Sequence, residues 1–522
     1  MMTINNDEQI KRVLVVGGGT AGWLSACHLA KKLSSSSPAG VQVTLVESEN
    51  IPTIGVGEGT VPAIRESLRY LGISETEFVR ECDATFKQGI KFANWVRPPG
   101  GAGSDFYHHV FDYPDTGIGD LTPYWLQSAK DRSYVDAVSV QGAVCDRGLG
   151  PKDMTIPEFE GIVSYAYHLD AAKFARLLTR HGVEKLGVTH LLADVQQVHR
   201  DESGNIRSVS TSAGEHIEAD LFVDCTGFAS LLLGQAMGVG FVDKRNVLFA
   251  DYALAAQLPY AVENSPIPSF TVSTAQESGW VWDIGLSERR GTGYVYSSAH
   301  TDHDRAETVF RRYLGDEGGK LSIRKIPMRV GHRQTYWKNN CVAIGLSQGF
   351  VEPLEATGIL VYDATARMLA DTFPANRSVM SIVARRFNQA VQYAWDRVID
   401  FIKLHYCISQ RKDHPFWVEN CEASTIPDSL AEKLQLWKSQ PPSAYEFPSK
   451  LEIFNLANYQ YVLYGMEFDT SIEKSISGRY SMMPAAQSRM NEIAGFSDQL
   501  LNSLPEHRAL IEKIKRFGLQ KI

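Results

Sequence analysis

Residues 13–33 read VLVVGGGTAGWLSACHLAKKL. This order predicts a short buried strand, a tight glycine turn and a helix with one apolar face. Gly17, Gly19 and Gly22 have the spacing G-x-G-x-x-G, in which the first glycine permits the turn, the second lets the backbone approach a pyrophosphate and the third packs helix on strand. We therefore predict that the turn binds a dinucleotide. A glycine turn with a purely structural role is the alternative.

The residues around the turn support a dinucleotide. Thr20 and Ala21 begin the predicted helix, whose N-terminus attracts a diphosphate. A second apolar strand, VQVTLV at residues 41–46, ends on Glu47, which is placed to accept hydrogen bonds from a pair of ribose hydroxyls. We expect these three residues to contact the cofactor together with the glycines.

Two later strands favour FAD over NAD. Residues 221–223 are apolar and run into DCTG at 224–227, and residues 341–346 read CVAIGL and contain Gly345. Their placement is that of large FAD enzymes, in which both segments flank the flavin. An ordinary strand-to-loop turn is the alternative for each segment. The sequence thus predicts an α/β fold with a doubly wound, Rossmann-like FAD domain of the flavin monooxygenase type.

The predicted domains divide the chain near residue 375. We assign residues 8–375 to the FAD-binding domain, assembled from noncontiguous segments, with substrate-facing insertions near 98–165 and 245–325. Long helical patterns, such as the one at 380–406, predict that residues 376–522 form a mainly helical substrate-binding module.

Composition narrows the class of protein further. The chain has 522 residues, of which 44% are hydrophobic, and its formal net charge of -8 opposes binding to nucleic acid. The 7 cysteines include no C-x-x-C pair, so we predict neither a disulfide framework nor a metal site. The first ten residues are polar, and no apolar stretch is long enough to span a membrane. We expect a soluble, cytoplasmic protein without a membrane segment.

Six motifs in order show a resemblance to the flavin-dependent halogenases of the tryptophan halogenase family. They are VVGGGTAGW at 15–23, IGVGEGTVP at 54–62, FKQGIKFANW at 86–95, GWVWDI at 279–284, FVEPLEATGI at 350–359 and HYCISQRKDHPFW at 405–417. The GWVWDI and lysine motifs are the specific ones, because many FAD monooxygenases share only the glycine turn. The chain departs from the family pattern where Gly285 follows Ile284, since the family has proline there.

The resemblance implies a reaction in two places. FAD, delivered as FADH2 by a separate NAD(P)H-dependent flavin reductase, reacts with O2, and a bound halide is oxidised to hypohalous acid. The acid then travels through the protein to Lys87, which would hold it beside the substrate as a haloamine or by hydrogen bonds. Glu355 would polarise the oxidant or accept the proton that the ring loses, and the backbone of Thr357 and Gly358 would hold the halide. The alternatives are a solvated surface lysine for Lys87 and a helix N-terminal charge for Glu355.

The family pattern also implies roles for four aromatic residues. Trp280 and Trp282 alternate along one strand face and would close the flavin pocket to organic molecules, with core packing as the alternative. His108 matches a histidine that stacks on the indole ring, although His109 is adjacent to it. Phe454 falls where an aromatic covers the other face of the substrate.

Two departures bear on the substrate and the halide. Tryptophan halogenases bind the amino acid with a tyrosine pair and a glutamate, whereas this chain has SAYEFPSKLEIF at 443–454, with Ser449 at the place of the glutamate. Because a zwitterion buried without partners is costly, an indole other than free tryptophan, or a phenol, fits better. Ala356 stands where serine is usual, which leaves chloride and bromide both open.

The sequence therefore predicts a FADH2-dependent halogenase that acts on a small electron-rich arene. A flavin-dependent aromatic hydroxylase and a non-catalytic flavin-binding protein are the alternatives. Whether the chain forms a homodimer stays open.

Overall fold

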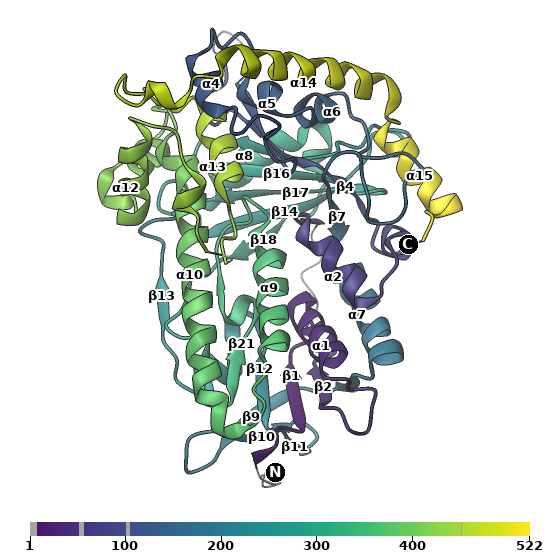
Figure 1. The fold of residues 1–522 in the computed structure, drawn as a ribbon. Helices are drawn as coiled ribbons and strands as arrows, with labels where there is room; N and C mark the ends of the chain where they lie inside the picture. The colour runs from purple at the N-terminus through teal and green to yellow at the C-terminus, as the bar shows by residue number, and fades with distance from the viewer. Residues whose placement is uncertain (1–7, 52–56, 101–104, 450, 522) are drawn as a thin grey trace.

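The computed structural model describes residues 8–51, 57–100, 105–449 and 451–521. The first part of the predicted IGVGEGTVP segment, residues 54–56, lies outside the described residues. Figure 1 shows a lower half built around the first strands and an upper half in which a second sheet is covered by helices of the C-terminal part.

The lower half contains a 6-stranded sheet that follows from the opening segment of the sequence. Strand β1 (Arg12–Val16) pairs in parallel with β12 (Leu221–Asp224) and with β2 (Gln42–Glu47), and its apolar residues are buried. The sheet order is β20-β21-β12-β1-β2-β8. The remaining strands are β20 (Trp337–Lys338), β21 (Cys341–Ala343) and β8 (Thr189–Leu192).

Two helices pack against the helix that follows the glycine turn. Helix α1 (Thr20–Lys32) follows the turn directly and packs against α9 (Thr357–Asp371) and α7 (Ala171–Leu186). Parallel strands connected through helices confirm the predicted doubly wound α/β domain.

The upper half contains a 7-stranded sheet whose order is β18-β14-β17-β16-β15-β5-β6. Its strands come from two distant parts of the chain, joined where Ile90 of β5 pairs with Thr271 of β15. The bounds are β5 (Gly89–Ala93), β6 (Phe106–Val110), β14 (Tyr252–Pro259), β15 (Thr271–Ala275), β16 (Gly279–Gly285), β17 (Arg289–Tyr296) and β18 (Arg324–Pro327).

A small sheet with the order β3-β7-β4 lies against this larger sheet. Strand β4 (Thr85–Lys87) carries the predicted catalytic lysine, and β3 (Gly57–Gly59) reaches it through β7 (Ala166–Asp170). Two further small sheets consist of β9 (Val195–Arg200), β10 (Ile206–Thr211) and β11 (His216–Glu218), and of β13 (Phe241–Asp243), β19 (Gly331–Arg333) and β22 (Gly349–Phe350).

Long helices dominate the C-terminal part, as the sequence predicts. Helix α10 (Met380–Cys407) runs along one side of the molecule from the lower to the upper half, and α13 (Leu456–Gly465) packs on β6 (Figure 1). Helix α14 (Met483–Ser503) crosses the top against helices of the predicted 98–165 insertion, so that segment and the C-terminal helices form one layer. The exact domain boundary at 375 stays a prediction.

The other helices are short. They are α2 (Ala63–Leu71), α3 (Glu75–Glu81), α4 (Thr122–Gln127), α5 (Tyr134–Val138), α6 (Gln141–Asp146), α8 (His303–Leu314), α11 (Pro415–Asn420), α12 (Asp428–Trp437) and α15 (His507–Phe517). No helix among the described residues has both the length and the apolar content that a membrane crossing requires.

Candidate active site

A cavity of about 560 Å³ opens where β1, β2 and β12 end. The glycine turn forms the floor of the cavity, which extends upward to Trp282 of the second sheet and to Lys87 of the small sheet. Of the seven residues predicted to bind the cofactor, six line the cavity. They are Gly17, Gly19, Thr20, Ala21, Gly22 and Glu47.

The geometry of the turn explains its glycines. Gly17 has a φ of +109°, and a Cβ atom there would lie 2.3 Å from the carbonyl oxygen of Cys225. A Cβ atom on Gly22 would lie 1.8 Å from the carbonyl oxygen of Gly17. At Gly19 a Cβ atom would meet nothing within 4 Å, and no side chain caps the N-terminus of α1. This open backbone fits the diphosphate of FAD.

Glu47 and Gly345 differ in their position relative to the cavity. Glu47 accepts hydrogen bonds from Trp23 Nε1 at 3.4 Å and from His190 Nε2 at 2.7 Å, which fix its carboxylate at the rim of the cavity. Gly345 does not itself line the cavity, whereas the adjacent Leu346 does, and the predicted contact of Gly345 with the cofactor stays a prediction. The φ of Gly345 is +83° and a Cβ atom would lie 2.6 Å from Cβ of Ala21, so a glycine is needed for close packing behind the turn.

Lys87 is fully buried on β4 and does not face solvent. Its Nζ donates a hydrogen bond to the carbonyl oxygen of Thr60 at 3.1 Å and lies 5.2 Å from the ring centre of Phe111. Burial lowers the pKa of Lys87 to about 8, although the charge of Glu355 acts in the opposite direction. The alternative of a solvated surface lysine is therefore wrong.

Glu355 lies in a buried cluster with two histidines. Its Oε1 is 2.8 Å from His405 Nε2, and both carboxyl oxygens are 3.0 Å from His109 Nδ1. Burial acts to raise the pKa of Glu355, but the two histidines outweigh it and lower the pKa. The carboxyl group is therefore ionised inside the protein.

A side-chain amide fixes the tautomer of His109. Asn458 Oδ1 accepts a hydrogen bond from the backbone N–H of Asn455 at 2.8 Å, so its Nδ2 faces His109 Nε2 at 2.9 Å and donates to it. His109 Nε2 is therefore an acceptor, and Nδ1 carries the hydrogen that points to Glu355. Sequence reasoning missed His405 and Asn458, although His405 begins one of the quoted motifs.

His109, and not the predicted His108, lies beside Glu355. Residues alternate along β6, so His109 faces Glu355 while His108 faces the other side and lies 3.0 Å from Asp146 Oδ1. Phe111, which continues the face of His109, lies next to Lys87. His108 therefore lies away from Glu355, and its contact with the substrate stays a prediction that this geometry does not support.

Phe454 belongs to an aromatic group that leads to His109. Its ring stacks on Phe401 with 4.0 Å between ring centres, and Phe401 lies 5.8 Å from the ring of His109. One face of Phe454 is therefore occupied by Phe401. The ring contacts of Phe454 thus lead to His109, whereas His108 contacts Asp146 and the ring of Phe270.

The two tryptophans of GWVWDI take different places. Trp282 lines the cavity, whereas Trp280 lies behind it, with 6.4 Å between the two ring centres. Trp280 Nε1 and Tyr406 Oη each donate a hydrogen bond of 2.6 Å to Oε2 of the buried Glu352. Burial raises the pKa of Glu352 to about 7, against the effect of these two donors. Glu352 thus anchors the tryptophan that supports Trp282.

The start of α9 forms a further wall of the cavity. Ala356 precedes the helix with a φ of +55°, and Ala356 and Gly358 both line the cavity. Thr357 is buried, and its Oγ1 has no partner among the described residues. The N–H groups of this first turn have no acceptor within the helix and are suited to bind an anion.

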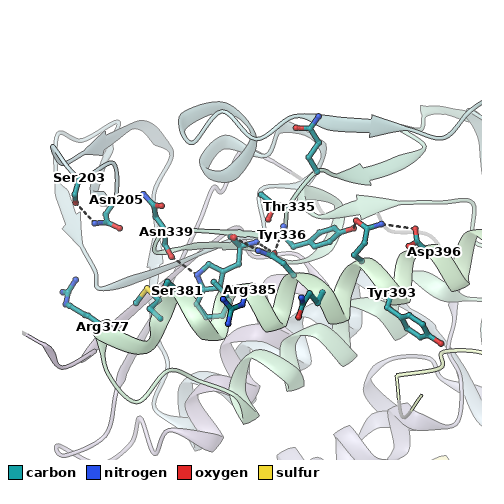
Figure 2. Close-up of a pocket in the computed structure, with 17 residues that line it drawn as sticks. Ser203, Asn205, Thr335, Tyr336, Asn339, Arg377, Ser381, Arg385, Tyr393 and Asp396 are labelled. Carbon is teal, nitrogen blue, oxygen red and sulfur yellow. Dashed lines mark hydrogen bonds between the residues drawn. The ribbon is translucent and has the colours of Figure 1, made fainter. Parts of the chain in front are cut away.

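A second hollow of about 920 Å³ lies along α10, away from these residues (Figure 2). Amide and hydroxyl groups line it, among them Asn205 and Tyr336, together with the charged Arg385 and Asp396. None of the predicted site residues lines it. In addition, no cluster of three or more metal-ligating side chains occurs in the described part of the chain.

Comparison with known proteins gives one consistent result. Residues 12–479 match the family model of tryptophan halogenases. The chain is 38% identical over 465 residues to tryptophan 6-halogenase SttH from Streptomyces toxytricini, covering 85% of this chain and 87% of the relative. It is 35% identical over 531 residues to tryptophan 7-halogenase RebH from Lentzea aerocolonigenes, covering 95% and 97%. The crystal structure of a tryptophan halogenase from Shewanella frigidimarina superposes with a TM-score of 0.95 at 43% identity and covers 99% of both chains.

Proposed function

The chain belongs to the tryptophan halogenase family, and from this premise we propose that it uses FADH2, O2 and chloride or bromide to halogenate an indole other than free tryptophan. It is a flavin-dependent halogenase, an oxidoreductase that acts on aromatic substrates. A separate NAD(P)H-dependent flavin reductase supplies the reduced cofactor.

The observation that carries the proposal is the place of Lys87, a fully buried amine on the wall of the flavin cavity. Bound reduced FAD, together with O2 and halide, supplies hypohalous acid at this cavity. The lowered pKa of Lys87, about 8, gives a small fraction of neutral amine near pH 7 in addition to the ammonium donor. Lys87 can therefore hold the oxidant either by hydrogen bonds or as a haloamine.

The cluster around Glu355 places a fixed negative charge beside the proposed substrate. Electrophilic halogenation makes the ring cationic before it loses a proton, and a carboxylate beside it stabilises that cation. We assign Glu355 to this role and to acceptance of the proton, with His109 and His405 holding its carboxyl group in place. His109, rather than His108, then faces the substrate ring.

Backbone groups at the start of α9 provide the halide site. The N–H groups of Thr357 and Gly358 belong to the uncapped first turn of a helix of 15 residues. Trp282 occupies the cavity wall nearby and leaves less room for an organic molecule at the flavin. This disfavours the hydroxylase alternative, in which the substrate must reach the flavin itself.

The segment 443–454 supports a substrate without a free amino acid group. Glu446 accepts hydrogen bonds from the backbone N–H of Ser443 at 2.7 Å and from Trp437 Nε1 at 2.8 Å. Glu452 accepts a hydrogen bond from the hydroxyl of Tyr393. Glu446 is thus fully engaged and Tyr445 is 94% exposed, whereas Oε2 of Glu452 is buried without a hydrogen-bond partner among the described residues. A buried zwitterion would therefore find one free carboxylate oxygen here, in place of the tyrosine pair and glutamate of the family pattern.

A competition between substrates and halides tests the proposal. The purified chain is supplied with FAD, NADH, a flavin reductase and bromide or chloride, and is offered tryptophan, indole, substituted indoles and phenols. We expect halide-dependent products with the matching isotope pattern in mass spectrometry, and less product from tryptophan than from an uncharged indole. Oxygen insertion without any need for halide would establish the hydroxylase instead, and flavin binding without any product would establish the non-catalytic alternative.

A further inference from the structure

A threonine and a histidine that the assigned roles do not use lie next to Lys87. Thr271 begins β15, is buried and lines the flavin cavity. Its Oγ1 lies 2.8 Å from Nε2 of His168 on β7. His168 is completely buried, and burial, together with the charge of Lys87, lowers its pKa well below the ordinary value. The imidazole is therefore neutral and carries one hydrogen.

The surroundings of His168 decide which nitrogen carries that hydrogen. Nδ1 is buried and has no hydrogen-bond partner among the described residues. An N–H group without an acceptor is rarer in folded proteins than an acceptor without a donor, because the orphaned donor loses more on leaving water. Nε2 is therefore the protonated nitrogen and donates to Thr271 Oγ1. The hydroxyl hydrogen of Thr271 is then free to point into the cavity.

A missing side chain opens the space into which this hydroxyl points. A Cβ atom on Gly59 would lie 3.2 Å from Lys87 Nζ, 3.5 Å from Thr271 Oγ1 and 3.6 Å from Ala356 Cβ. One small space is thus bordered by an amine, a hydroxyl and a methyl group. It lies between the start of α9, where halide is proposed to bind, and the buried lysine.

We propose that Thr271 is a second hydrogen-bond donor to the oxidant held by Lys87, and that His168 is the positioning residue that directs the Thr271 hydroxyl. This inference rests on the proposed function and extends it. Hypohalous acid offers an oxygen with lone pairs, which accepts hydrogen bonds from the amine and from the hydroxyl without any bond being made or broken. Two donors from rigid strands hold that oxygen more closely than a single flexible lysine does.

The test measures how much of the oxidant reaches the substrate. Thr271→Val removes the hydroxyl while keeping the shape, and Thr271→Ser keeps the hydroxyl. His168→Leu removes the donor to Thr271, whereas His168→Gln retains an amide donor near the position of Nε2. Each variant is assayed for halogenated product per flavin oxidised, for free oxidant with a small diketone trap added outside the protein, and for FAD affinity by fluorescence.

We expect Thr271→Val and His168→Leu to lower the product per oxidised flavin about fivefold to tenfold, since one hydrogen bond is lost. Free oxidant should rise correspondingly, and FAD affinity should stay within about twofold of the original chain. Thr271→Ser and His168→Gln should recover most of the product. Thr292→Val is the matched control, because Thr292 is buried like Thr271 but does not line the cavity, and its hydroxyl has no hydrogen-bond partner among the described residues.

The outcomes separate this inference from the proposed function. If the original chain makes no halide-dependent product, the proposed function is wrong. If it makes product and Thr271→Val gives the same product per flavin and the same free oxidant, the role of Thr271 is overturned. If Thr271→Val and Thr292→Val lose product equally, or if both Thr271→Val and Thr271→Ser weaken FAD binding, Thr271 has a structural role and the inference also fails.

Discussion

His405 Nε2 lies 2.8 Å from Glu355 Oε1, while His405 Nδ1 lies 2.9 Å from the carbonyl oxygen of Phe401. A carbonyl oxygen only accepts, so Nδ1 carries a hydrogen. One further proton is then shared between Nε2 and the carboxyl group. The charge and hydrogen bond of His405 help to hold the pKa of Glu355 low, so the two residues form a buried ion pair that keeps the carboxyl group ionised.

The ion pair predicts a change in the pH dependence of halogenation when His405 is lost. In His405→Leu the pKa of Glu355 should rise, because burial then acts with one histidine fewer against it. A carboxylate is the active form, so product formation should fall as pH drops through the raised pKa, and the acid limb of the pH profile should move up by about 1 to 2 pH units. His108→Gln is the control, because His108 faces Asp146 instead. Superimposable profiles for His405→Leu and the original chain would contradict the ion pair.

Lys87 should reduce stability while it supports catalysis. Its pKa falls from the ordinary 10.5 to about 8 in the folded state, so the folded protein binds fewer protons than the unfolded chain between these values. Stability is therefore lost as pH falls from about 10.5 to about 8, and the cost below pH 8 is about 3 kcal/mol.

The variant Lys87→Met tests the cost of Lys87 to stability and its role in halogenation together. It fills the same space without a charge, so the free energy of unfolding at pH 7 should rise by about 1 to 3 kcal/mol in urea titrations. Halogenated product should fall by at least about 10²-fold, while FAD still binds and free oxidant is still released. A variant that is less stable and yet keeps its product would contradict the assigned role of Lys87.

The cofactor turn could be predicted from sequence because its determinants are local. Gly17, Gly22 and Glu47 lie within about one strand-turn-helix unit and the following strand, and the fingerprint describes that geometry. The helix expected at residues 380–406 is observed as Met380–Cys407 for the same reason, since an apolar face repeats along it.

The features that could not be predicted depend on strand pairing and helix packing between segments that are far apart in sequence. His108 and His109 are adjacent and of one type, and only the pairing of β6 with β5 decides which of them faces Glu355. The burial of Lys87 depends on β3 and β7 covering β4, and the residues concerned are far apart in sequence. His405 meets Glu355 only because α10 passes beside the start of α9.

The lack of a side chain at Gly293 should be required for the observed position of the Trp282 indole. A Cβ atom on Gly293 would lie 2.1 Å from Cη2 of Trp282 and 2.5 Å from the carbonyl oxygen of Leu254. Gly293→Ala therefore forces the indole out of its place, and we expect a loss of about 1 to 3 kcal/mol in the free energy of unfolding. Trp282→Leu on the Gly293→Ala background should recover part of this loss, because the clash with the indole is removed while the one with the Leu254 carbonyl oxygen remains. Additive destabilisation in the double variant would show that the indole is not what the methyl group displaces.

The C-terminal helix should control the stability of the lysine strand through His507. This residue of α15 is fully buried, and its Nε2 accepts a hydrogen bond from the backbone N–H of Phe86 at 3.0 Å. Its Nδ1 donates to the carbonyl oxygen of Ile267 at 2.9 Å. The two bonds require a neutral ring, and burial lowers the pKa of His507 from 6.5 to about 4, although the bond to Ile267 opposes this. Phe86 directly precedes Lys87, so the helix holds the catalytic strand in place.

Below pH 6.5 the unfolded chain takes up a proton at this histidine and the folded protein does not, so stability falls as pH drops towards about 4. His507→Gln keeps an acceptor for the Phe86 N–H but does not titrate, and it should flatten this part of the stability profile measured by urea unfolding at several pH values. His507→Leu leaves the N–H group buried without a partner, which should cost about 1 to 3 kcal/mol at every pH and lower product formation without changing FAD affinity. If the Gln and Leu variants behave alike at pH 8, the bond to Phe86 contributes nothing to the fold, and the C-terminal helix is not the support of the lysine strand.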